Sequence, residues 1–368
     1  MPSRCCVRCR CSRRIVRETA EAIDLKNGVT IEILTASFRT VRGYTLIAAL
    51  CDEIAFWRSD ESANPDSEII GAIRPAMATI PGAMLLCASS PYARRGALWT
   101  AFRKFFGKDN PVLVWKADPR TMTPTVPESV IEEAYENDPA SAAAEYGAEF
   151  RADVETFVSR EVVDAAVVQG RHELPPMARS HYVGFVDPSG GSADSMTLAI
   201  AHRDGDRVVL DAVRERRPPF SPDDVTLEFA ALLKAYRVRE VSGDRYGGEW
   251  PAERFRARGI TYVPAEKPKS DLYRDLLPIL NAHRAELLDL PRLAAQLCSL
   301  ERRTARGGRD NIDHPPGVHD DVANAVAGAI CRALGAPRPL AITPEILAQL
   351  SNAPKYRYRP PWEPRNFD

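Results

Sequence analysis

The chain has 368 residues, enough for two domains of ordinary size. Hydrophobic residues make up 45% and charged residues 27%, which is typical of a folded globular protein and excludes a largely disordered chain. No stretch approaches the roughly 18 apolar residues that span a bilayer, and no signal peptide is visible, so we expect no membrane segment. The 49 Lys and Arg residues balance 50 Asp and Glu residues. Any contact with nucleic acid must therefore come from local arginine clusters.

The eight cysteines form two groups. Four are spread singly along the chain, as in proteins of a reducing cytoplasm. The other four lie within the first eleven residues and lack the paired CxxC spacing and nearby histidine of common zinc sites. They are Cys5, Cys6, Cys9 and Cys11. They either bind zinc or belong to a flexible, basic start, and their composition favours the second interpretation.

The first half of the chain shows buried-strand patterns. Two continuous apolar runs, at residues 44–51 and 83–88, are typical of parallel strands covered on both faces. The first run ends in Asp52-Glu53, and the second in a pair of serines. We also expect strands at 29–34 and 111–116 and a helix at 97–106. The residues that follow combine several prolines with an acidic helical stretch, which favours a linker.

A second α/β unit begins near residue 179. We expect strands at 181–186, 196–201, 207–213, 240–243 and 261–264, and helices at 222–236, 249–258, 271–283, 293–303 and 320–334. The whole chain then divides into a disordered basic start (1–14), a first α/β domain (15–116), a linker (117–178), a second α/β domain (179–335) and a polar tail (336–368).

Acidic residues follow two of the expected strands and begin the last helix. Asp187 follows strand 181–186, Asp244 follows strand 240–243, and Asp320 and Asp321 open the helix. These positions can converge at one edge of a sheet, where neighbouring carboxylates raise one another's pKa unless cations neutralise them. Two Mg²⁺ ions about 3.5–4 Å apart neutralise such a cluster and promote phosphodiester cleavage.

Mg²⁺, with Mn²⁺ as an alternative, suits an all-oxygen ligand set. Consecutive helical residues point about 100° apart, so we expect only one of Asp320 and Asp321 to be the main ligand. Taken singly, Asp187 is better explained as a turn residue and Asp320 as a helix cap, whereas the set in this order favours a metal site. His319 either supports the ligands or simply begins the helix.

Together these motifs resemble the large subunits of tailed-phage terminases. The segments GFVDPSGGSAD, SGDRYGGEW and GVHDDVANAVAGA resemble the RNase H-like nuclease domain of that family. Further upstream, CDEIAFW resembles its Walker B segment, SSP its coupling motif, and FRTVRG the arginine-bearing approach to Walker B. The resemblance runs from about residue 24 to about residue 334. It implies an α/β chain with a partial P-loop-type ATPase sheet followed by an RNase H-like nuclease domain.

The resemblance also implies roles for individual residues. Asp52 would support the magnesium ion of ATP, Glu53 would polarise the attacking water, and Arg42 would act as an arginine finger. Ser89 and Ser90 would couple ATP hydrolysis to movement. The nuclease metal ligands would be Asp187, Asp244, Asp320 and Asp321. It further implies double-stranded DNA as substrate, the small terminase subunit and the portal as partners, a homo-oligomer on the portal, and the cytoplasm of a bacterial host.

One feature departs from the family pattern. A terminase ATPase needs a glycine-rich phosphate loop with a lysine before Walker B, whereas the only Gly-Lys pair here is Gly107-Lys108, which lies after it. We therefore expect an N-terminally incomplete ATPase domain, and we expect this chain not to hydrolyse ATP.

An arginine cluster precedes the last helix. Arg302, Arg303, Arg306 and Arg309 surround a Gly-Gly pair and are placed to contact the DNA backbone without reading bases; the alternative is a solvated surface. Two other functions stay open. An RNase H-like transposase or resolvase explains the carboxylates but not the first 110 residues. An inactive prophage remnant would only bind DNA or packaging partners.

Overall fold

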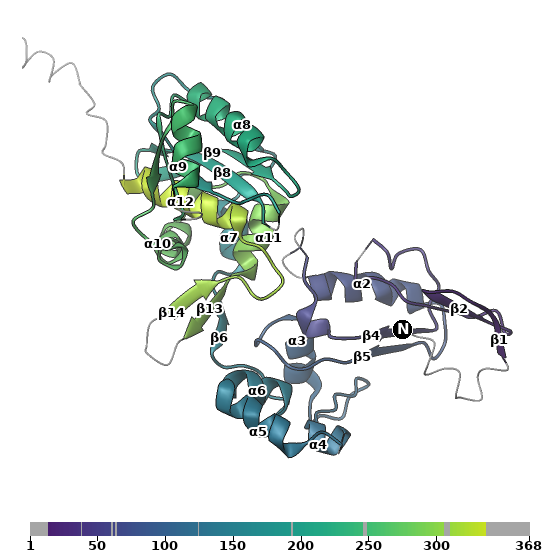
Figure 1. Cartoon of the computed structure of the whole chain (residues 1–368). Coiled ribbons are helices and arrows are strands. Elements are labelled where there is room, and N and C mark those ends of the chain that lie inside the picture. Colours follow the sequence, from purple (N-terminus) through teal and green to yellow (C-terminus); the bar gives the residue numbers. More distant parts are fainter. Residues whose placement is uncertain are drawn as a thin grey trace, which may run out of the picture. The chain divides into compact units, whose positions relative to one another are not determined.

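The computed structural model describes residues 14–37, 39–59, 62, 65–123, 125–192, 194–245, 249–304 and 310–335 (Figure 1). Contacts divide the chain into one compact unit, Met1–Leu334, and a second, Gly335–Asp368. The expectations for the N-terminal cysteines, the tail, Arg306 and Arg309 lie outside the described residues. No helix in the described part of the chain has the length and apolarity that a bilayer crossing requires.

The N-terminal part, residues 14–123, contains two small sheets. An antiparallel sheet consists of β1 (Ile15–Glu18), β2 (Ala22–Leu25) and β3 (Thr30–Glu32). A parallel pair consists of β4 (Ala48–Cys51) and β5 (Met84–Cys87), so only the last four residues of the apolar run 44–51 form a strand. The pair packs with the short turn η2 (Ile54–Phe56) and with α2 (Pro65–Met77) and α3 (Gly96–Phe105).

The strand expected at residues 111–116 is not formed, so this prediction was wrong. The segment has irregular structure, and Leu113 and Trp115 are 89% and 69% exposed. A short apolar run fits a buried strand only when a neighbouring strand and a core are available, and sequence periodicity does not report on either.

The expected linker contains regular structure. Its helices are α4 (Pro119–Met122), α5 (Glu128–Asn137), α6 (Pro139–Glu145) and α7 (Arg160–Ala166), and its strand is β6 (Val154–Thr156). Asp118, Asp138 and Ser159 cap three of these helices by accepting hydrogen bonds from backbone N–H groups. The strand and the last helix pack with the residues that follow, and Val163 and Ala166 lie in their core. The domain limits stay a prediction.

The C-terminal part, residues 154–335, is built on a six-stranded sheet of order β11-β10-β7-β8-β9-β12. Its strands are β7 (Tyr182–Asp187), β8 (Met196–Asp204), β9 (Arg207–Arg216), β10 (Glu240–Gly243), β11 (Thr261–Pro264) and β12 (Ala285–Glu286). Only β8 runs opposite to the others. The order β9-β8-β7-β10-β11 with this single antiparallel strand is the topology of the RNase H-like fold, which confirms the expected fold class.

Helices cover both faces of this sheet. One face carries α8 (Pro222–Ala235) and α9 (Trp250–Ala257), and Phe229 and Leu233 pack there against Val186. The other face carries α7, α10 (Lys269–Asn281), α11 (Pro291–Ser299) and α12 (Asp321–Gly335). Val183 and Phe185 face this second layer, as the two-residue period of a strand requires.

The last helix approaches the sheet closely because its inner face is small. A methyl group on Gly328 would lie 2.3 Å from ring carbons of Phe185 on β7. The helix therefore rests directly on the central strand.

Helix α11 ends earlier than expected, at Ser299, and the chain continues as a hairpin. Its strands are β13 (Glu301–Thr304), which pairs with β6, and β14 (Asp310–Asp313). The prediction that the helix continues to residue 303 was wrong, because pairing with strands distant in sequence outweighs the local helical preference.

Candidate functional site

Two carboxylates meet at the ends of neighbouring parallel strands. Asp187 is the last residue of β7, and Asp244 directly follows β10, whose Gly243 is paired with Val186. Both carboxylates accept a hydrogen bond from the side-chain amide of Asn324 on α12. The Nδ2 atom lies 2.9 Å from Asp187 Oδ2 and 2.7 Å from Asp244 Oδ2. One amide therefore joins the two strand ends.

Asp320 and Asp321 are both buried at the start of α12, but their surroundings differ. Asp320 accepts a hydrogen bond from Tyr273 at 2.8 Å and lies 3.0 Å from Lys269 Nζ. Asp321 has a buried Oδ2 atom for which the described residues provide no hydrogen-bond partner. An unpaired buried carboxylate oxygen is costly unless a cation or water completes it. Of the two neighbours, Asp321 has the environment of a metal ligand.

The electrostatics of the cluster show that its negative charge is undercompensated. Burial raises the pKa of Asp187 well above its usual range, and the nearby Asp244 adds to this, while the Asn324 hydrogen bond opposes it. Burial also raises the pKa of Asp244, again against the Asn324 hydrogen bond. The pKa of Asp321 rises to about 6, through burial first and Asp320 second. A bound cation would reverse these shifts by favouring the charged carboxylates.

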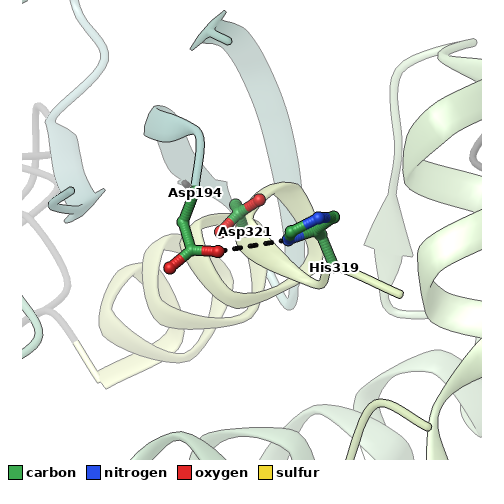
Figure 2. Close-up of side chains that lie close together, drawn as sticks. All are labelled: Asp194, His319 and Asp321. Atoms are coloured by element: carbon green, nitrogen blue, oxygen red, sulfur yellow. Dashed lines mark ion pairs between the residues drawn. The ribbon is translucent and has the colours of Figure 1, made fainter. Parts of the chain in front are cut away.

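Two residues outside the four expected aspartates, Asp194 and His319, lie close to Asp321. The Asp194 carboxylate lies 3.3 Å from His319 Nδ1, and one ligand atom from each of Asp194, His319 and Asp321 falls within 4.8 Å of the others. Figure 2 shows Asp194 and His319 facing one another with Asp321 beside them. Oxygen and imidazole donors at this spacing suit a divalent cation. From the sequence, Asp194 was interpreted as a residue of the turn between two strands without a role in metal binding, and His319 was left undecided.

A similar group around Asp320 is partly neutralised by a lysine. Asp313, His314 and Asp320 also have ligand atoms within 4.8 Å of one another. However, Lys269 Nζ lies 2.8 Å from Asp313 and 3.0 Å from Asp320, and this ammonium group offsets one of their two negative charges. The lysine therefore acts here as an internal cation.

The expected ATP-site residues lie in the N-terminal part. Glu53 accepts hydrogen bonds from Ser89 Oγ at 3.2 Å and from the backbone N–H of Ser90 at 3.4 Å. Asp52 directly follows β4 and is exposed. Arg42 lies in a turn before β4 and is also exposed. The structure thus brings Glu53 together with the two serines of the expected coupling motif. The ATP-related roles of these residues stay a prediction.

The described arginines of the expected DNA-binding cluster lie on β13 and are paired. Arg302 forms a salt bridge with Asp310 of the facing strand β14. Arg303 Nη2 lies 3.0 Å from Glu301, which is fully buried. The two side chains are 48% and 34% exposed, so both retain surface toward solvent. Their contact with DNA stays a prediction.

Sequence reasoning missed the neutral and basic residues that hold the carboxylates. Asn324 lies one helical turn after Asp320 and Asp321, and this spacing places it near them on the helix. That signal was available but ambiguous, because a polar residue on a helix is usually solvated. Tyr273 and Lys269, which bind Asp320, lie some fifty residues earlier in the chain, and no local pattern connects them with it.

Comparison with solved structures finds phage large terminases. The chain is similar in structure to several of them. It matches the large terminase nuclease of thermophilic phage G20c with 17% identity and a TM-score of 0.41, over 46% of this chain and 94% of that one. It matches the large terminase of bacteriophage HK97 with 14% identity and a TM-score of 0.41, over 87% and 78% of the two chains. The large terminase of another thermophilic bacteriophage gives 12% identity and a TM-score of 0.38, over 85% and 76%. No protein-family model and no curated protein matches the chain.

Proposed function

We propose that this chain is a phage terminase large subunit whose C-terminal part cuts double-stranded DNA with two divalent cations. The observation that carries the proposal is the convergence of Asp187, Asp244 and Asp321 on one edge of an RNase H-like sheet. Their charge is undercompensated, and one buried oxygen has no partner among the described residues. Structural ion pairs do not need such an arrangement, whereas metal-dependent phosphodiester cleavage does.

The donor set fits two cations. Asp187 and Asp244 supply carboxylates at the strand ends, and Asp321 supplies a third beside them. Asp194 and His319 supply further donor atoms close to Asp321. When bound, the cations would activate water and stabilise the leaving oxygen. Asp320 has a different role in this proposal, since it binds Tyr273 and Lys269 and so anchors the start of α12 on α10.

The remaining parts of the proposed function concern DNA and ATP. Arg302 and Arg303 present partly exposed guanidinium groups on β13, which suits contact with phosphates independent of base sequence. The contact of Glu53 with Ser89 supports a role of this pair in sensing nucleotide. Packaging of concatemeric DNA, with a portal and a small subunit as partners, belongs to the same proposal.

The test is cleavage of supercoiled plasmid by the purified chain with Mg²⁺, Mn²⁺, Ca²⁺ or a chelator. We expect nicked and linear products with Mg²⁺ and Mn²⁺ but not with Ca²⁺, because water activation needs a small ion in tight geometry. Asp187→Asn should abolish cleavage. Asp204→Asn, an exposed aspartate at the end of β8, is the matched control and should cut normally. Absence of cleavage with every cation would favour the inactive-remnant interpretation.

A further inference from the structure

The only polar group that joins the two strand-end carboxylates directly in the described structure is neutral. Asn324 is 1% exposed, and its Nδ2 atom donates to Oδ2 of both Asp187 and Asp244. Carboxylate oxygens accept hydrogen bonds, and the NH₂ end of the amide, which can donate two, faces them. Its own oxygen, Oδ1, is buried without a partner among the described residues. The amide therefore donates to both aspartates while its own oxygen has no hydrogen-bond partner among the described residues.

We propose that Asn324 is a positioning residue that holds Asp187 and Asp244 at the spacing required for cation binding. The inference rests on the proposed nuclease function and identifies how its metal site is preorganised. Each carboxylate has two oxygens, and the amide engages only Oδ2 of each. The Oδ1 atoms can therefore bind cations while Asn324 keeps both side chains in place.

Asn324 reaches this position because of how α12 lies on the sheet. One turn further along the helix, Gly328 allows direct contact with Phe185 of β7. This contact fixes the helix over the strand that ends in Asp187. The backbone N–H of Asn324 donates to the Asp320 carbonyl at 2.8 Å, so the residue belongs to the regular helix. Its side chain then falls between the ends of β7 and β10.

The chemistry of the site favours an amide here over other side chains. A carboxylate would add a further negative charge within hydrogen-bond distance of two others. An apolar side chain would leave two nearby carboxylates to repel one another without a donor. Groups that orient metal ligands by hydrogen bonding typically contribute about 10–100-fold to metal affinity or activity.

The experiment compares wild type and Asn324→Leu by plasmid cleavage over a range of Mg²⁺ concentrations. We expect the Mg²⁺ concentration for half-maximal cleavage to rise about 10-fold to 100-fold. The rate at saturating Mg²⁺ should fall by a smaller factor, because the cations themselves then hold the carboxylates. A residue needed only for folding would lower the amount of folded protein without moving this concentration.

Two further variants complete the design. Gln296→Ala removes another buried amide, whose Oε1 accepts a hydrogen bond from the Ala323 backbone of α12 at 2.9 Å. It should lower the unfolding temperature but leave half-saturation by Mg²⁺ within about twofold. Asn324→Ser keeps a small polar group that is too short to reach both carboxylates, and it replaces Asn324→Leu if that variant does not fold. It should show the same rise in half-saturation.

Direct Mn²⁺ binding to the full chain, measured by calorimetry, separates this inference from the proposed function. Weaker Mn²⁺ binding in the Asn324 variants than in Gln296→Ala supports the positioning role, even if wild type does not cut DNA. Cleavage by wild type, with half-saturation by Mg²⁺ unchanged in a folded Asn324 variant, would overturn the positioning role and leave the nuclease proposal standing.

Discussion

Individual carboxylates in the C-terminal part differ in how their charge is balanced. Asp320 is paired with Lys269 and Tyr273, whereas Asp321 has an unpaired oxygen and a pKa raised to about 6. The same two residues are adjacent in sequence and equally acidic in isolation. Their roles therefore follow from the partners that α10 places beside one of them, and substitutions should separate the roles.

Replacing Asp321 by Asn should remove a pH dependence from the stability of the metal-free protein. The folded-state pKa, about 6, lies above the ordinary value of 3.8, so the folded state retains the proton longer than the unfolded state. Wild type should then lose stability as pH rises from about 4 to about 6 and stay less stable above that range. A shift of about two pKa units corresponds to about 3 kcal/mol.

Urea unfolding at pH 4 and pH 8 with a chelator present measures this effect. The free energy of unfolding of Asp321→Asn should fall less between the two pH values than that of wild type. An equal fall in the free energy of unfolding in both proteins would show that ionisation of Asp321 does not cause the loss of stability at high pH.

Asp320→Asn should lower stability more than it lowers DNA cleavage. It weakens the contacts with Lys269 and Tyr273, and we expect the free energy of unfolding to fall by about 1–3 kcal/mol. Because the residue is not a proposed metal ligand, the folded variant should retain more cleavage activity than Asp321→Asn. Unfolding curves and plasmid cleavage on both variants test the distinction, and equal loss of cleavage would place both residues in the metal site.

At the scale of single elements, α12 determines the geometry of the site. Its small inner face brings the helix onto β7, and this contact positions Asp321 and Asn324 over the strand ends. Gly328 is the residue with the least room, since a methyl group there would lie 2.3 Å from the ring of Phe185.

Gly328→Ala should therefore destabilise the protein by about 1–3 kcal/mol, the usual cost of overpacking a core. The displaced helix should also weaken cleavage. Gly71→Ala in α2 is a matched control, because nothing lies within 4 Å of the added methyl group and alanine is the better helix former. Thermal unfolding of both variants is the measurement, and an unchanged unfolding temperature in Gly328→Ala would mean that the helix does not rest on Phe185 as described.

The elements also show which features the sequence could predict. Strands β10 and β11 have the expected bounds, because each is a short segment with β-branched or aromatic residues that lies between a helix and a turn. Residues 111–116 have the same kind of composition but form no strand, since no strand of the described structure pairs with them. The β13–β14 hairpin was missed because its partner β6 lies about 150 residues earlier in the chain.

In the site, too, local sequence patterns predicted some residues, whereas residues whose role depends on distant partners were missed. The aspartates were predictable because strand ends and helix starts can be located from sequence patterns. Asn324, Lys269 and Tyr273 were not, because their meaning depends on which carboxylate lies opposite them in space.

At the scale of the whole molecule, the proposed site couples cation binding to folding. The unfolded chain does not hold its carboxylates together, so a cation that binds only the folded state raises stability by mass action. A concentration one hundred times the dissociation constant contributes about 2.7 kcal/mol. We expect Mg²⁺ to raise the unfolding temperature of wild type by several degrees but to have little effect on Asp187→Asn. Thermal unfolding with and without Mg²⁺, at constant ionic strength, measures this, and an equal shift in both proteins would indicate nonspecific ion binding.

The most direct test of the proposed function is the rate at which the purified chain linearises supercoiled plasmid in Mg²⁺, compared between wild type and Asp244→Asn. Asp244 contacts the same amide as Asp187, and its substitution removes one proposed ligand while keeping a side chain of the same shape. We predict cleavage by wild type and a loss of at least about 100-fold in a folded Asp244→Asn variant. Cleavage at the wild-type rate by that variant would contradict the assignment of this carboxylate cluster as the nuclease site.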